Sequence, residues 1–130
     1  LGIEIGLENV EFQVKLDREQ SGDYQISRAG WIGDYMDPMT FLDLWWSDSA
    51  FNDVKYNNPE YDALIQKAKT TTDQAERMEA MRQAEKMLME DMPVLPVYFY
   101  TQPYTVKPNV TGIIKVPVRY PIITYADITD

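Results

Sequence analysis

The spacing of apolar residues changes twice in the first quarter of the chain. Apolar and polar positions alternate over residues 3–7, which predicts a half-buried strand. Over residues 10–20 the apolar positions lie one helical turn apart and a Ser-Gly pair follows, which predicts a short helix. Alternation returns at residues 24–26, in a second strand. The order strand, helix, strand predicts a β-α-β unit with a right-handed crossover.

Two longer helices are predicted in the middle of the chain. Asn58 caps the first, with a proline at the first helical position. Asp73 and Glu76 resemble a capping box at the start of the second, which ends near Asp91 because Pro93 cannot continue it. The side chains expected to be buried are Tyr61, Leu64, Ile65 and Ala68 in the first helix, and Met78, Met81, Ala84 and Leu88 in the second.

The last part of the chain differs in composition from the rest. Proline and tyrosine are concentrated after residue 95, and short apolar segments at 97–100 and 113–116 predict strands. Strands this short cannot close a core by themselves. We therefore expect the tail to pack on another part of the protein.

Charge and composition narrow the possible functions. The chain of 130 residues has a net charge of −9, no histidine and no cysteine. An acidic chain repels phosphate backbones and anionic membrane surfaces, so no nucleic-acid partner is expected. The lack of cysteine excludes a disulfide framework, a thiol nucleophile and a cysteine-ligated metal. No apolar run approaches the ~20 residues of a membrane span.

A glycine-containing motif, RAGWIGDYMDPMTFL at residues 28–42, follows the second predicted strand. Its glycines let another chain approach the backbone closely, and Asp34 places a negative charge beside that backbone. An extended ligand with a positive amino terminus would fit such a site. The alternative is an ordinary strand and loop with a solvated carboxylate. Asp37 is expected to cap a helix that starts at Pro38.

This motif resembles the signature of the peptide-binding branch of bacterial solute-binding proteins, the family 5 receptors of oligopeptide (and nickel) ABC importers. Residues 17–26, 56–62, 88–93 and 94–100 resemble the same family in the same order. The resemblance implies a receptor and not an enzyme, with an oligopeptide ligand, a membrane permease as partner and no cofactor. It also implies an extracytoplasmic location, in the periplasm or as a cell-surface lipoprotein, with the export signal outside this sequence.

The resemblance further implies an α/β fold, as part of a periplasmic-binding-protein-like fold of type II. Residues 1–95 would belong to its carboxy-terminal lobe. Residues 96–130 would be a hinge-crossing and tail segment that packs on a missing amino-terminal lobe. Without the resemblance, residues 94–100 would be read as an ordinary edge strand.

The family also implies roles for individual residues. Asp34 would hold the peptide's α-ammonium group through charge-assisted hydrogen bonds. Three residues would pair with the peptide backbone as an added strand: Gly30, Trp31 and Ile32. Arg28 would meet the peptide's carboxylate or a carbonyl, although a surface ion pair is an equal alternative. Two residues of a later polar loop, Asn52 and Asp53, would lie near the ligand.

Other functions stay open at this stage. Within the family the ligand could be a dipeptide, a nickel chelate, haem or an oligosaccharide. Outside it, Asp34 and Asp37 could form the carboxylate pair of a glycoside hydrolase. The chain could also be a structural or interaction module. If neither free nor acetylated peptides bind, the peptide assignment fails and sugars or chelated metals become the candidate ligands.

Overall fold

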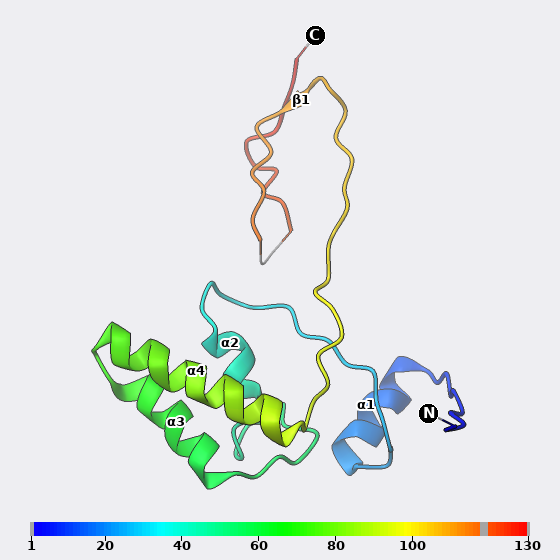
Figure 1. The fold of residues 1–130 in the computed structure, drawn as a ribbon. Helices are drawn as coiled ribbons and strands as arrows, with labels where there is room; N and C mark the ends of the chain where they lie inside the picture. Colours follow the sequence, from blue (N-terminus) through cyan, green and yellow to red (C-terminus); the bar gives the residue numbers. More distant parts are fainter. Residues whose placement is uncertain (1, 118–119, 130) are drawn as a thin grey trace.

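The computed structural model describes residues 2–117 and 120–129, which form a helical unit and a long extended tail (Figure 1). The described elements, in chain order, are α1 (Phe12–Ser21), α2 (Met39–Leu42), the 3-10 helix η1 (Asp43–Trp45), α3 (Pro59–Thr70), α4 (Gln74–Asp91), β1 (Val110–Thr111) and β2 (Asp127–Ile128). Helices α3 and α4 lie side by side, and α2 lies against them (Figure 1).

Helix α3 begins where its cap was predicted. The Asn58 side chain accepts hydrogen bonds from the backbone N–H groups of Glu60 and Tyr61, at 3.0 and 3.3 Å, and Pro59 takes the first helical position. These bonds satisfy two of the donors that a helix start leaves open.

The start of α4 differs in part from the predicted capping box. Asp73 accepts the backbone N–H of Glu76 at 2.9 Å, as expected. The Glu76 carboxylate does not turn back to the cap, however, because it accepts from the Thr71 hydroxyl at 2.8 Å and pairs with Lys67 at 2.9 Å. Glu76 therefore links the two helices across their short connection.

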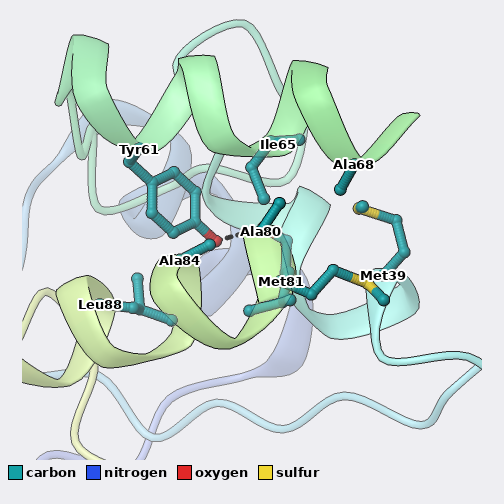
Figure 2. Close-up of a cluster of buried hydrophobic side chains, with 9 residues drawn as sticks. Met39, Tyr61, Ile65, Ala68, Ala80, Met81, Ala84 and Leu88 are labelled. Carbon is teal, nitrogen blue, oxygen red and sulfur yellow. Dashed lines mark hydrogen bonds between the residues drawn. The ribbon is translucent and has the colours of Figure 1, made fainter. Parts of the chain in front are cut away.

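The core lies between α2, α3 and α4 (Figure 2). Seven of the eight predicted positions are buried or half-buried, but Met78 is 44% exposed. The buried stripe of α4 is centred on Ala80, Ala84 and Leu88, so Met78 falls on its solvent side. Two small alanines on this stripe let α4 approach α3 closely, and Tyr61 and Ile65 fill the remaining space.

The β-α-β unit is only partly realised. Its helix is present as α1, which ends at Gly22 with φ of 78°, as the Ser-Gly signal predicted. Residues 2–10 and 24–27 form no strand, and Leu7 is 97% exposed. Strand formation needs a neighbouring strand to accept its backbone hydrogen bonds, and in the described part of the chain neither segment has one.

The tail likewise departs from its prediction. Residues 93–106 run as an extended arm away from α4 and lead to a hairpin (Figure 1). No strand forms at 97–100, and within 113–116 only Ile114 pairs, in a bridge with Ile122. The hairpin instead pairs Val110 with Ile128 and Thr111 with Asp127 in an antiparallel register. Among the described residues this is the only sheet, so the expected strands lack partners here as well.

Candidate functional site

The motif loop is held in shape by a small side chain in α2. The backbone N–H of Asp34 donates to Thr40 Oγ1 at 3.0 Å, and Thr40 is buried. Gly33 is buried against the same helix, where a Cβ atom would lie 3.2 Å from Thr40 and 3.3 Å from Phe41. Glycine at this position therefore lets the loop close on α2. The Asp34 side chain stays exposed.

The other end of the loop is anchored by Asp37. One carboxylate oxygen accepts the backbone N–H of Met39 at 2.9 Å, but α2 begins one residue later than predicted, so that Pro38 takes the N-cap position and Asp37 precedes it. The same carboxylate accepts two hydrogen bonds from Arg77 in α4, at 2.6 and 2.9 Å. The bonds from Arg77 hold the pKa of the Asp37 carboxyl below its ordinary value, although partial burial opposes them.

An open pocket of about 310 Å³ lies beside this loop. It is lined by Trp31, Asp34, Tyr35, Thr40, Asp43, Leu44, Trp46, Ser49, Ala50, Phe51 and Lys69. The rings of Trp31 and Phe51 meet edge to face, with centroids 5.0 Å apart. The pocket thus combines aromatic walls with carboxylates, which is a suitable surrounding for a cation attached to an apolar group.

A lysine from α3 closes one side of the pocket. The Lys69 ammonium lies 4.7 Å from the ring centroid of Trp46 and 3.6 Å from an Asp43 oxygen. These contacts partly neutralise Asp43. Neither of these Lys69 contacts involves Asp34. Asp34 is exposed, whereas Asp37 at the other end of the motif loop is half-buried.

Arg28 lies where the tail crosses the motif. Its guanidinium donates to the hydroxyl of Tyr98 at 3.2 Å and to the hydroxyl of Tyr100. The two tyrosine rings pack together with centroids 5.1 Å apart. Hydrogen bonding from Tyr100, together with that from Arg28, lowers the pKa of Tyr98. A Cβ atom on Gly30 would come within 4.0 Å of the same Tyr100 ring.

The later polar loop has a structural task that the sequence did not indicate. Asn52 is 4% exposed, and its amide donates to the carbonyls of Trp46 and Tyr56 and accepts from the Tyr56 N–H. The Asp53 carbonyl accepts from the Tyr24 hydroxyl at 3.3 Å. The Asn52 amide is therefore engaged within the chain, and a ligand role for Asn52 and Asp53 stays a prediction.

The structure divides the predicted site residues into separate places. Trp31 and Asp34 line the pocket, Arg28 and Gly30 face the tail crossing, and Ile32 is exposed outside the pocket lining. Sequence reasoning missed the pocket residues that come from other elements: Thr40, Asp43 and Lys69. The contact of Thr40 with Asp34 could have been predicted, because both residues lie within the motif. The sequence contains no indication that Lys69 in α3 would line the same pocket.

In the part of the chain that the structure covers, no helix has the length and apolar character to cross a membrane. Over the same residues, no group of three or more acidic side chains is arranged to hold a metal ion.

Comparisons with known proteins agree with the motif. Residues 1–53 match the model of bacterial extracellular solute-binding proteins, family 5 Middle. The oligopeptide-binding protein OppA of Bacillus subtilis is 40% identical over 115 residues, which are 88% of this chain and 21% of that protein. The chain spans about a fifth of the length of the curated relatives it matches.

Solved structures show the same correspondence in three dimensions. The murein tripeptide binding protein MppA of Escherichia coli has a TM-score of 0.78 and 38% identity, covering 86% of this chain and 22% of that one. The Haemophilus influenzae OppA complex with RPPGFSPFR has a TM-score of 0.75 and 38% identity, covering 82% and 21%. The resemblance is confirmed: this chain is similar to one part of the oligopeptide-binding proteins of family 5, and it has a partial α/β fold of the periplasmic-binding-protein type II class.

Proposed function

We propose that this chain is part of a solute-binding receptor of an ABC importer that captures peptides, with Asp34 as the anchor for the peptide's amino terminus. The observation that carries the proposal is the placement of Asp34. Its backbone N–H is held by Thr40, and the residue is exposed and lines a pocket with aromatic walls. The similar proteins include oligopeptide-, dipeptide- and murein-peptide-binding proteins, and this supports a peptide as the ligand.

Binding would depend on two features that all unmodified peptides share, the backbone and the α-ammonium group. Residues 28–32 are exposed and belong to no helix or strand, so their backbone can pair with an extended peptide. The three N–H donors of an α-ammonium group would point to Asp34. The side chain of the first peptide residue would then lie against Trp31 and Phe51. Because the pairing and the Asp34 contact involve only the backbone and the amino terminus of the peptide, the site would bind peptides of many different sequences.

The remaining contacts would come from a second lobe. We place residues 1–95 in one lobe and residues 96–130 in a segment that crosses to the other, and the bonds of Arg28 to Tyr98 and Tyr100 support a crossing at this point. The peptide would stabilise a closed form by touching both lobes, and this form would deliver it to a membrane permease. Such a receptor acts outside the cytoplasm, is no enzyme, and could be held to the membrane as a lipoprotein.

Calorimetric titration with matched peptides tests the proposal. Each short peptide is titrated into the full-length protein that carries this chain, once with a free and once with an acetylated amino terminus. Breaking a buried charge pair costs about 2–5 kcal/mol, so acetylation should weaken binding by about 30-fold or more.

The Asp34→Asn variant is the matched control, because it keeps the shape of the side chain and removes its charge. In this variant, free and acetylated peptides should bind with similar affinity. If acetylation has no effect on the wild-type protein, Asp34 is not the anchor. If neither peptide binds, the peptide assignment itself fails.

A further inference from the structure

We infer that Arg77 is a positioning residue for the Asp34 anchor, acting through Asp37 and the motif loop. The inference rests on the proposed function, since it concerns how the amine-binding carboxylate is held. Arg77 lies in α4, more than forty residues beyond Asp34 in the sequence, and nothing in the motif points to it. Its effect on Asp34 follows from a continuous series of contacts.

The series begins with a two-point contact. Both terminal nitrogens of Arg77 donate to the two Asp37 oxygens, at 2.6 and 2.9 Å. The two side chains are only 22% and 27% exposed. A bidentate pair of this kind fixes orientation as well as distance, which a single ion contact does not. Asp37 is therefore held on the rigid hairpin of α3 and α4.

Asp37 in turn sets the start of α2. Its side chain accepts the N–H of Met39 at 2.9 Å, and its carbonyl accepts the N–H of Thr40 at 3.2 Å. Thr40 then accepts the N–H of Asp34 at 3.0 Å. Each step is a direct hydrogen bond, so a shift of Asp37 would move Thr40 and, through it, the backbone of Asp34.

The loop between these points needs such support. Tyr35 and Met36 are exposed, so packing contributes little to the shape of residues 34–36. A binding group on a loop keeps its geometry only where neighbouring residues determine it. The two ends of this loop are held at Thr40 and at Asp37, and Arg77 ties the second end to α4 in addition to the packing of Met39 in the core.

The sign of the effect separates positioning from simple electrostatics. Replacing Arg77 with methionine removes a positive charge and leaves Asp37 unpaired, which makes the site more negative. If Arg77 acted only through its field, a free ammonium group would bind more tightly in the variant. Positioning predicts the opposite result, because a loosened Asp34 loses part of its directed contact with the ammonium group.

The test measures free and acetylated peptides against the full-length protein with Arg77→Met. We expect the free peptide to bind about tenfold more weakly, as when part of a buried charge pair is lost, and the acetylated peptide to be nearly unaffected. The control is Arg82→Met. Arg82 lies in the same helix and makes a similar two-point contact with Glu79, at 2.8 and 2.6 Å, away from the loop.

The other outcomes overturn the inference in distinguishable ways. Equal weakening of both peptides would show that Arg77 only supports the fold, and tighter binding of the free peptide would show a field effect. If wild-type protein does not distinguish the two peptides, the Asp34 anchor fails and the inference fails with it. Should Arg77→Met not fold, Arg77→Lys replaces it, because a lysine keeps the positive charge and loses the two-point contact, so that weaker binding of the free peptide alone would still report positioning.

Discussion

The Tyr61→Phe substitution should show how much one hydrogen bond between α3 and α2 contributes to the free energy of unfolding. Tyr61 is fully buried, and its hydroxyl donates to the carbonyl of Leu42 at 2.5 Å (Figure 2). Burial raises the pKa of the Tyr61 phenol further above neutral pH. The Tyr61→Phe variant keeps the ring and its edge-to-face contact with Tyr56. Only the hydrogen bond is lost.

The expected loss follows from the chemistry of the two atoms. A hydrogen bond contributes about 0.5–1.5 kcal/mol net, and leaving a buried acceptor without a partner raises the cost to about 1–3 kcal/mol. Urea unfolding of the chain, followed by tryptophan fluorescence, reports this change because Trp45 and Trp46 pack against the core. Tyr125→Phe is the control, since Tyr125 is 69% exposed. A loss below about 0.5 kcal/mol, or the same loss in the control, would refute the reasoning.

Two further changes probe other parts of the chain. Burial and the hydrogen bond to Asp91 raise the pKa of Tyr56 to about 12. Because the pKa is higher in the folded state, this phenol stabilises the fold below its unfolded pKa of about 10, and the contribution should fall between pH 10 and 12. Alkaline unfolding of Tyr56→Phe should show a flatter decline. Gly112→Ala places a Cβ atom 1.9 Å from the Tyr125 carbonyl oxygen, at a φ of 76°. It should abolish hydrogen-exchange protection at Ile114 while leaving α3 and α4 unchanged by circular dichroism.

The helices could be predicted because their signals are local. Asn58, Asp73 and Gly22 bond to atoms within five residues of themselves, so a short window of sequence contains both partners. The strands could not be predicted in this way. An alternating pattern indicates which side chains face a core, but it does not show whether a neighbouring strand is present to pair with. Residues 3–7 carry the right pattern and still find no partner among the described residues.

The candidate site shows the same division. Asp34, Trp31 and Asp37 lie within one motif and could be named from it. Arg77 is 40 residues from Asp37, and only the packing of α4 on α2 brings the two together. The family resemblance implies a place near the ligand for Asn52, in the later polar loop. Its burial and its bonds to two carbonyls depend on how that loop folds back on itself, which its composition does not reveal.

The short connection between α3 and α4 has a consequence for the order in which the chain folds. Thr71–Asp73 is the whole link between the two helices, and most core residues come from these two elements. Contacts that are close in sequence cost little loop-closure entropy, so this hairpin should form within microseconds to milliseconds, before longer-range contacts. The motif loop would then dock onto a preformed surface when Arg77 meets Asp37. Ligand-binding geometry would thus be acquired as a late step, on a scaffold that does not depend on it.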